Sequence, residues 1–528
     1  MFTFTFNSGT APASRPLHPA DAIPQQHPGQ PSGNAAEYHH TSGFRASSWG
    51  PWLALAVLAS RLPWLPRWLE DHDSVNFALG LARFDLAEHR PHFPGYPVYL
   101  ALAALVRTFG ATDAVALALP AMLAAAAATW AVFAVLRPRV GAGGALAAAV
   151  LYALLPGPWL ADATPLSDGL GVHAVTLLLC GALAAPGSLR VLLVTALACG
   201  LLPGVRASLL AMALAVLIWL LVQGQGRRLA ALAASAAGVL AWLLPLAVLA
   251  GGPSALLDIG FSFVDGHFHD WGHTAFTDAG NGPAVVWPQR LAAFAGNLLH
   301  YALGPVAVAA LLVSAAGLWF QAPADRKPWI LLAMALPYAL WVALGQNPDK
   351  PRHVLPLLPP LLLAVAHGLP GLVTLAQRLR LPALGRLAFA AAMVLAAVAV
   401  PRLAVRATEP PPGLQLARWL ASVPPEQTQV YSGAETRLLR LEAPGHRSTR
   451  VRSLAEMQTD LTTRGNRPQR LLVTSGVPGL PQDGTFRLVA RFPPRAGVDG
   501  PGAGLVLHAW TPQPRVVVAA RAPIEVVP

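Results

Sequence analysis

Long uncharged apolar runs recur along the 528-residue chain and limit what it can fold into. Three of them are residues 114–136, 229–257 and 291–324. A helix needs about 20 apolar residues to cross the hydrocarbon core of a bilayer. Only 12% of the residues are charged, against about 25% in ordinary soluble proteins. The pattern predicts an all-α polytopic membrane protein and argues against a disordered chain or a large soluble enzyme.

The apolar runs predict eleven membrane spans within a transmembrane module at residues 49–402. The span cores are residues 52–65, 114–136, 141–161, 169–189, 191–205, 207–226, 229–257, 291–324, 328–348, 353–377 and 387–401. Arg61 interrupts the first of these near its end, where an arginine side chain can snorkel to the interface. The apolar stretch Tyr96–Phe109 is predicted to lie at the outer surface, because a further span would reverse the side of every later loop.

The distribution of charge predicts the orientation. One alternate set of connections carries ten basic residues and a single acid, Asp325. Such loops stay in the cytoplasm. Thirteen acidic residues lie in the opposite set, which includes large outer loops at 67–112 and 251–290. We therefore expect a multi-pass protein of the bacterial inner membrane, with its N-terminus in the cytoplasm and its C-terminus in the periplasm. The net charge of +12 then reflects topology and does not indicate nucleic-acid binding.

The two ends of the chain differ from the apolar middle. Residues 1–48 are rich in Pro, Ser, Gly, His and Gln, a composition typical of a disordered tail, here on the cytoplasmic side. Residues 403–528 are charged and Pro-rich, and they carry short β-like runs and helical stretches. The runs are Gln429–Tyr431, Leu471–Thr474, Phe486–Phe492 and Leu505–Trp510, and the stretches are Ala434–Leu441 and Ser453–Thr463. The pattern predicts a small periplasmic α/β domain.

Three carboxylates stand together directly after the first span. Glu70, Asp71 and Asp73 occupy three of four consecutive positions. Their repulsion raises the pKa of at least one of them unless a cation or metal neutralises it. The group is typical of a general base or a metal site. The alternative is a solvated acidic cap at a helix N-terminus.

This loop resembles the first outer loop of the glycosyltransferase C superfamily. The acidic pair is followed by Pro-Gly-Tyr-Pro-Val-Tyr at 94–99. The resemblance covers residues 50–400. It is closest to the family 39-like branch, with protein O-mannosyltransferases, lipid A aminoarabinose transferases and Rgt-type sugar transferases. It implies a polyprenyl-phosphate sugar donor and a catalytic aspartate. Asp73 matches that aspartate best and Asp71 second best. His92-Phe93-Pro94 stands where many relatives have His-Pro-Pro.

Further outer residues are candidates for the same site. Asp168 is either a helix N-cap or the family's second acidic position, and Asp73 with Asp168 is the candidate pair for a divalent metal. Arg206 and Arg352, with His353 beside the latter, are candidates for donor phosphate, because guanidinium groups bind phosphate bidentately. The alternative for both arginines is snorkelling to the interface.

The long outer loop carries His267, His269, Trp271 and His273 together with Asp265 and Asp270 within nine residues. Histidines and acids at this density indicate either a zinc site, direct contact with sugar or phosphate, or a polar loop over the cavity. Candidates for contact with sugar or acceptor are Glu70, His92, Tyr96, His267, His269, Trp271 and His273. His173 and His367 lie within spans, and we interpret both as hydrogen-bonded packing residues.

Together these features predict an inverting membrane glycosyltransferase. It would move a sugar from a polyprenyl-phosphate donor to an acceptor hydroxyl on an envelope glycan, lipid or protein at the periplasmic face. The first alternative is a lipid or solute transporter or flippase, which would place ionisable groups near the bilayer midplane. The second is a non-catalytic scaffold whose C-terminal domain binds a partner.

Overall fold

The structure is a computed structural model that describes residues 49–224, 226–277, 287–319, 327–371, 384–463, 469–481, 485–499 and 503–510. The predicted tail at 1–48 lies outside the described residues. What is described is mostly helical, with a mixed five-stranded sheet near the C-terminus. Six described helices are long and apolar enough to cross a membrane, and four shorter apolar helices accompany them. These features identify a multi-pass membrane protein, while the count of eleven spans stays a prediction.

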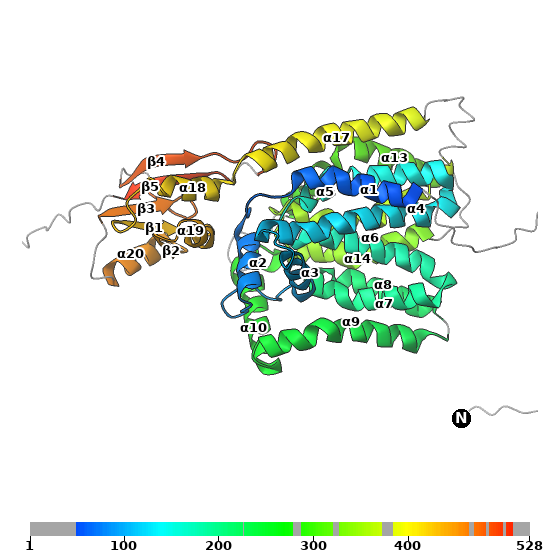
Figure 1. The fold of residues 1–528 in the computed structure, drawn as a ribbon, viewed down its shortest axis with the longest axis horizontal. Helices are drawn as coiled ribbons and strands as arrows, with labels where there is room; N and C mark the ends of the chain where they lie inside the picture. Colours follow the sequence, from blue (N-terminus) through cyan, green and yellow to red (C-terminus); the bar gives the residue numbers. More distant parts are fainter. Residues whose placement is uncertain are drawn as a thin grey trace, which may run out of the picture. The chain divides into compact units, whose positions relative to one another are not determined.

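The helices of the membrane module form a bundle (Figure 1). Their bounds are α1 (Trp49–Arg61), α2 (His72–Ala82), α3 (Pro97–Arg107), α4 (Asp113–Ala153), α5 (Pro156–Asp162), α6 (Ser167–Ala184), α7 (Leu189–Val205), α8 (Leu210–Gln223), α9 (Arg228–Leu249), α10 (Pro253–Gly266), α12 (Trp287–Gly296), α13 (Gly304–Trp319), α14 (Lys327–Gly345), α15 (Leu358–Ala366) and α17 (Leu384–Thr408). Short 3-10 and π segments join several of them, of which η3 (Ala207–Leu209), η4 (His267–Trp271), η5 (Asn297–Leu303) and η6 (Pro351–Leu357) matter below.

Several uncharged runs predicted as single spans are broken in the structure. The 229–257 run is divided between α9 and α10, where Gly251 and Gly252 have positive φ angles of 91° and 120° before Pro253. The 291–324 run is divided among α12, η5 and α13. Hydropathy identifies segments that are stable in lipid or in a protein core. It does not detect a turn within such a segment when the residues of the turn are themselves apolar or small. Figure 1 shows α10 turned away from the axis of α9.

The stretch predicted to lie at the outer surface forms α3. With 11 residues, α3 is about 16 Å long at 1.5 Å per residue, which is too short to cross a hydrocarbon core of about 30 Å. Helices α2, α3 and α10 gather at one end of the bundle, the end that also carries the C-terminal sheet (Figure 1). This end holds the first outer loop.

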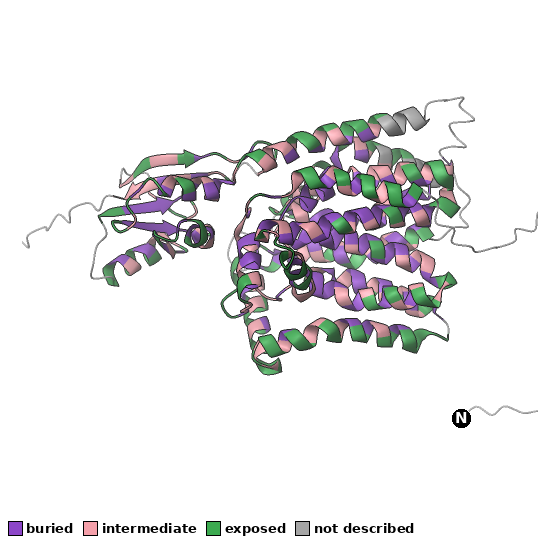
Figure 2. Ribbon diagram, viewed as in Figure 1, coloured by how far each residue is buried: buried purple, intermediate pink, exposed green. Residues whose placement is uncertain are grey.

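The centre of the bundle is packed with small and apolar side chains from α4, α6, α7, α8, α14 and α15. Figure 2 shows buried residues concentrated on α4 and α6, whereas α9 at the edge is largely exposed. Helices α7 and α9 approach closely at Gly200, where an added Cβ would lie 2.0 Å from the Ser235 carbonyl oxygen. Small residues allow such close helix pairs in membranes.

Arg61 does not snorkel to an interface, which corrects the expectation from the sequence. Its side chain is buried and its Nε lies 3.2 Å from Asp162 Oδ2. The guanidinium lies over the Trp159 ring, 4.6 Å from the ring centroid. Asp162 Oδ1 also lies 2.6 Å from His173 Nε2, and Tyr152 Oη lies 2.7 Å from His173 Nδ1. His173 is thus a hydrogen-bonded packing residue, as predicted, in a network that joins α1, α4, α5 and α6.

We expect Asp162→Ala to destabilise the bundle by roughly 3–5 kcal/mol, because it leaves Arg61 buried without its counter-ion. The double variant Arg61→Met, Asp162→Ala should recover most of that loss, since no uncompensated charge remains. Thermal unfolding of the purified variants in detergent measures both effects. Equal stability of Asp162→Ala and the wild type would contradict this account of the network.

The C-terminal domain is α/β, as predicted. Its elements are α18 (Pro412–Leu420), β1 (Thr428–Ser432), α19 (Thr436–Glu442), β2 (Arg447–Arg450), α20 (Leu454–Thr463), β3 (Arg470–Thr474), β4 (Phe486–Phe492) and β5 (Leu505–Trp510). The strand order is β2-β1-β3-β5-β4, with β2, β1 and β3 parallel and β5 antiparallel to its two neighbours. Helices α18 and α19 cover one face and α20 covers the other. Sequence reasoning missed β2, whose Arg-Ser-Thr-Arg sequence has no apolar run, and α18.

Candidate active site

The first turn of α2 places two of the three clustered acids. Asp71 is the N-cap residue of α2, and its Oδ1 accepts a hydrogen bond of 2.9 Å from the Ser74 backbone N–H. Ser74 Oγ in turn accepts from the Asp71 N–H at 2.9 Å, which completes a capping box. A carboxylate is favoured here by the partial positive charge of the helix N-terminus. One oxygen of Asp71 therefore caps the helix N-terminus, which is the alternative role considered for this acidic group.

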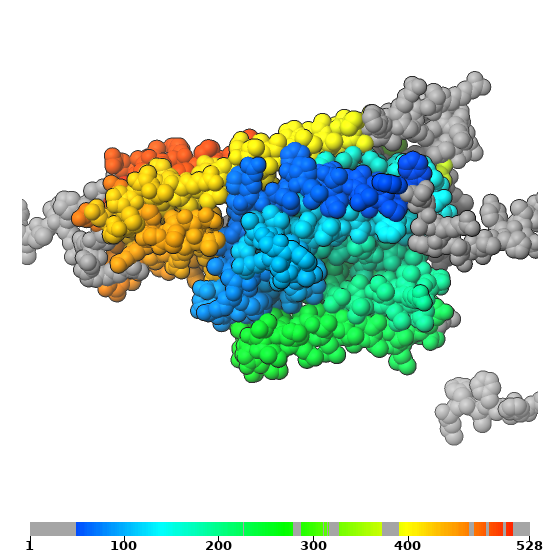
Figure 3. All heavy atoms as spheres, in the orientation of Figure 1, coloured from blue at the N-terminus to red at the C-terminus, as the bar shows by residue number. Residues whose placement is uncertain are grey.

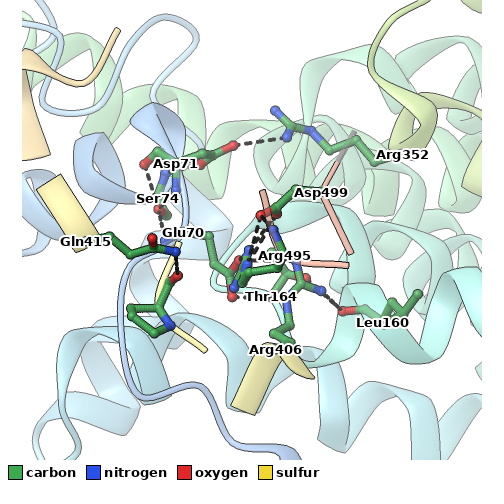
Figure 4. Close-up of polar contacts among 11 residues, drawn as sticks. Glu70, Asp71, Ser74, Leu160, Thr164, Arg352, Arg406, Gln415, Arg495 and Asp499 are labelled. Carbon is green, nitrogen blue, oxygen red and sulfur yellow. Dashed lines mark hydrogen bonds and ion pairs between the residues drawn. The ribbon is translucent and has the colours of Figure 1, made fainter. Parts of the chain in front are cut away.

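The other Asp71 oxygen faces Arg352, at the start of η6. Arg352 Nη1 lies 3.1 Å from Asp71 Oδ2, and its Nη2 lies 2.5 Å from Asp73 Oδ2. Figure 4 shows the guanidinium of Arg352 directed at Asp71 from a separate part of the bundle. Arg352 Nε also lies 3.6 Å from Asp168 Oδ2. One guanidinium thus joins acids from two connections that the sequence predicts to lie on the outer side.

Asp168 lies between two arginines. Its Oδ1 is 2.9 Å from Arg206 Nη1, and its side chain is only 6% exposed. Arg206, between α7 and η3, also donates to Ser167 Oγ at 3.3 Å and to Ser208 Oγ at 3.1 Å. The N-cap of α6 is Leu166, so Asp168 sits in the first turn and is not the cap residue considered from the sequence. The structure therefore brings together Asp71, Asp73, Asp168, Arg206 and Arg352.

Nearby cations settle the ionisation of Asp73. Burial by itself raises the pKa of this carboxyl, but the surrounding positive charges, of which Lys350 contributes most, hold the pKa well below its usual range. Repulsion among clustered acids is thus overcome by cations. Lys350 Nζ lies 4.0 Å from Asp73 Oδ2. Sequence reasoning did not place Lys350 in the site, although it stands two residues before Arg352 and is one of only two lysines in the chain.

The cations also bear on the two predicted metal sites. Asp73 and Asp168 both face Arg352, so a divalent ion between them would have to displace its guanidinium. Within the described part of the chain, no three His, Cys, Asp or Glu side chains converge as metal ligands would, and this includes the histidines of the long outer loop. Three carboxylates and three basic side chains balance one another in the cluster. These side chains therefore fit a site that binds an anion, with the carboxylates giving up their cationic partners to it, better than they fit a metal centre.

Glu70 points away from this cluster. Its Oε1 accepts from Arg406 Nε at 2.9 Å, and its Oε2 is paired with Arg495 of the C-terminal domain (Figure 4). The Glu70 side chain is 5% exposed. Both of its oxygens are thus taken by arginines, which favours an anchoring role over the contact with acceptor proposed from the sequence.

His92 and Tyr96 form a neutral pair beside the cluster. His92 Nε2 lies 3.1 Å from Tyr96 Oη, and both rings pack near Phe77. Tyr96 has a left-handed φ of 48° and Pro97 follows as the first residue of α3, so the Gly-Tyr-Pro turn directs this pair inward. Burial lowers the pKa of His92 to about 4 against the opposing charge of Asp73. Burial also raises the pKa of Tyr96 to about 12.

The long outer loop contributes part of its predicted set. Phe263 of α10 stacks on His92 at 6.2 Å and on His267 at 6.4 Å between ring centroids. Trp271 lies 5.2 Å from His267, so the two continue an aromatic row that starts at His92. His269 instead pairs with Asp265 in an exposed position. The carbonyl of His273 accepts a hydrogen bond of 3.1 Å from Arg290 Nη1.

His353, next to Arg352, is buried at the edge of a pocket. The pocket is lined by Arg290, Phe294, Asn297, Val342, Ala343, Asn347, Pro348, Lys350, His353 and Val354. Among the described residues, none offers a hydrogen-bond partner to His353 Nδ1. A buried imidazole nitrogen of this kind is suited to bind a polar ligand.

Comparison with known proteins shows a likeness of fold. No family model and no curated protein matches the chain in sequence. The structure is similar to ArnT from Cupriavidus metallidurans bound to undecaprenyl phosphate, with a TM-score of 0.51 and 14% identity over 87% of this chain and 97% of that one. The apo state of that protein gives 0.48 and 13%, over the same shares of the two chains. The Archaeoglobus fulgidus oligosaccharyltransferase in complex with Zn and sulfate gives 0.43 and 16%, over 76% of this chain and 62% of that chain.

ArnT is an aminoarabinose transferase and a membrane glycosyltransferase of the C type. The resemblance drawn from the first outer loop is therefore confirmed at the level of the fold.

We expect the folded protein to lose stability as pH falls from about 6.5 to about 4, in part through His92. The folded His92 ring stays neutral down to about pH 4, whereas an unfolded histidine binds a proton near pH 6.5. In this window the unfolded state holds more protons, so acid favours unfolding. His92→Gln should show a shallower fall in the unfolding temperature over this range. The exposed His269→Gln serves as control, and equal slopes for His92→Gln and the wild type would contradict the assignment.

Proposed function

We propose that the chain is an integral membrane glycosyltransferase that moves a sugar from a polyprenyl-phosphate donor to an acceptor hydroxyl, with inversion. The acceptor is an envelope glycan, lipid or protein, and the reaction takes place at the periplasmic face of the inner membrane. The observation that carries the proposal is the carboxylate of Asp73 at the start of α2, held 2.5 Å from Arg352 Nη2 and 4.0 Å from Lys350 Nζ. The ArnT-like fold supports it, as does the undecaprenyl phosphate bound to that relative.

In this reaction Asp73 accepts the proton of the acceptor hydroxyl. The acceptor oxygen forms a bond to the anomeric carbon as the bond from that carbon to the phosphate oxygen breaks. The electron pair of the broken bond leaves with the polyprenyl phosphate. Attack opposite the leaving group inverts the anomeric centre. General-base assistance of this kind contributes roughly 10²–10⁴-fold to rate.

The basic side chains of the cluster bind the donor phosphate. Lys350 is the least committed of them, because its side chain is 47% exposed and 4.0 Å from Asp73. Arg352 Nε makes a longer contact of 3.6 Å with Asp168 Oδ2 and no hydrogen bond to any described residue, so it can donate to a phosphate oxygen. Arg206 and His353 complete the proposed phosphate-binding set. We propose that His92, Tyr96, His267 and Trp271, which form one aromatic row, contact the sugar or the acceptor.

A transporter or flippase is the alternative. The Arg61–Asp162–His173 network is ionisable and lies inside the bundle, but Asp162 is 0% exposed and bonded on both oxygens, which leaves no room for cargo. A direct assay decides between the two functions. Purified protein given a labelled polyprenyl-phosphate sugar and envelope lipids or glycans should release polyprenyl phosphate. A transporter or a scaffold would leave the donor intact.

Asp73→Asn should lower sugar transfer by roughly 10²–10⁴-fold, because the amide cannot accept the proton. The helix should still form, since Asp71 and Ser74 keep the capping box. Asp71→Asn is the matched control, because asparagine caps a helix as well as aspartate does. Transfer rates and thermal unfolding of the two purified variants test the assignment. Near-normal transfer by Asp73→Asn with loss in Asp71→Asn would move the role to Asp71, and near-normal transfer in both would exclude this loop.

Arg352→Ala should weaken donor binding by roughly 10-fold to 100-fold, because charge-assisted hydrogen bonds to phosphate are lost. Arg352→Lys should recover only part of the affinity, since an ammonium lacks the bidentate fork. Arg83→Ala, which removes an exposed arginine from the same outer region, should leave affinity unchanged. Donor titration of the three variants measures this, and wild-type affinity in Arg352→Ala would remove the residue from the site.

A further inference from the structure

The C-terminal domain contacts the same helix that carries Asp71 and Asp73. In Figure 3 the first outer loop, in blue, lies directly against this domain. A single apolar cluster runs from Val75 on α2 to Leu438 and Leu439 on α19. The domain is thus not an appendage joined to the membrane module only through α17. Polar contacts hold it to α2 at two further points.

The first contact lies immediately before α2. Glu70 is paired at once with Arg406, at the end of α17, and with Arg495, which follows β4. Arg495 Nη2 also lies 2.8 Å from Asp499 Oδ1, and the Arg495 N–H donates to Asp499 Oδ2 at 2.8 Å. The Arg495 side chain is 2% exposed. Buried, doubly paired charges of this kind fix the position of the residue just before the N-cap.

The second contact lies one turn into α2. Arg437 of α19 donates to Asn76 Oδ1 at 2.8 Å. The same guanidinium bonds the carbonyl oxygens of Glu88 and His89, both at 2.7 Å, in the loop after α2. In addition, His72 Nδ1 lies 3.1 Å from the Ala434 carbonyl oxygen. One arginine therefore ties α2 and its following loop to the C-terminal domain.

Asp73 lies between the two contacts, three residues from each of Glu70 and Asn76. We infer that the C-terminal domain positions Asp73 for proton transfer, and that Arg437 and Arg495 are positioning residues of the reaction. This inference rests on the proposed function. The C-terminal domain contacts one side of α2, and Arg352, which belongs to the membrane module, binds the carboxylates of Asp71 and Asp73. A carboxylate displaced by about 1 Å loses a large share of its effect, on the order of 100-fold.

Arg437→Ala is the central test, with Arg440→Ala as the matched control. Arg440 lies on the same helix, but its Nε donates to the Ser448 carbonyl within the C-terminal domain and not to α2. In Arg437→Ala we expect kcat to fall about 10-fold to 100-fold while the donor KM stays within about 2-fold, because the phosphate-binding residues are untouched. Arg437→Lys should restore only part of kcat, since lysine lacks the planar fork. Arg440→Ala should behave as the wild type.

Hydrogen exchange of the backbone amides of residues 72–82 supplies a readout that does not depend on activity. We expect Arg437→Ala to lose protection there and Arg440→Ala to keep it. Asn76→Ala removes the same hydrogen bond from the other side. It should reproduce both effects, and the double variant should be no worse than either single one. Asn76→Ala also keeps the test valid if Arg437→Ala fails to fold.

The outcomes separate the two proposals. Normal kcat in both Arg437→Ala and Asn76→Ala overturns the positioning role, whatever the exchange shows. A fall in kcat with unchanged exchange in residues 72–82 overturns it as well, because α2 has then not been loosened. If the wild type transfers no sugar, the proposed function fails, and the positioning of Asp73 for transfer fails with it. Loss of protection in Arg437→Ala would then still establish the physical contact with α2.

Discussion

The ion pairs of Arg352 are the interaction on which the candidate site depends. This side chain joins Asp71 and Asp73, which are 281 and 279 positions away in the sequence, and it approaches Asp168 from the same side. Three carboxylates do not gather in a partly buried place unless positive charge accompanies them, because repulsion and lost hydration both oppose it. The start of α2, the start of α6 and the segment before α15 are therefore held together by one guanidinium.

Sequence patterns predicted the local features of this arrangement and missed the long-range ones. Asp71 can be recognised from the sequence as a possible helix start, because its capping hydrogen bonds involve residues within four positions of it. The acids and arginines of the outer connections were found because charge is rare in this chain. Their pairing was not predicted, because the sequence of an outer loop does not indicate which arginine contacts which acid. Lys350 and the anchoring of Glu70 by Arg406 and Arg495 emerge only when segments more than 270 positions apart are folded together.

The membrane module shows the same limit in another form. Hydropathy located the apolar helices, but it merged α9 with α10, because Gly251, Gly252 and Pro253 interrupt a helix without adding charge. It also favoured an interfacial Arg61. The environment of Arg61 was inferred from its neighbours in sequence, which are apolar. The Asp162 that neutralises Arg61 lies 101 positions away. A buried ion pair forms between two distant segments, so the sequence of either segment alone does not indicate it.

The low pKa of Asp73 conflicts with a role as a general base, because a strongly paired carboxylate binds a proton weakly. The cluster itself indicates how the conflict is resolved. Its three carboxylates already balance Lys350, Arg206 and Arg352, so under the proposed function a donor phosphate would enter as an extra anion and compete for the same cations. Under the proposed function, a phosphate that drew Lys350 and Arg352 away from Asp73 would remove two of the charges that lower the pKa of Asp73, which would make Asp73 a better proton acceptor. Donor binding would thus prepare the base, and the same exchange would leave Asp73 largely inert while no donor is bound.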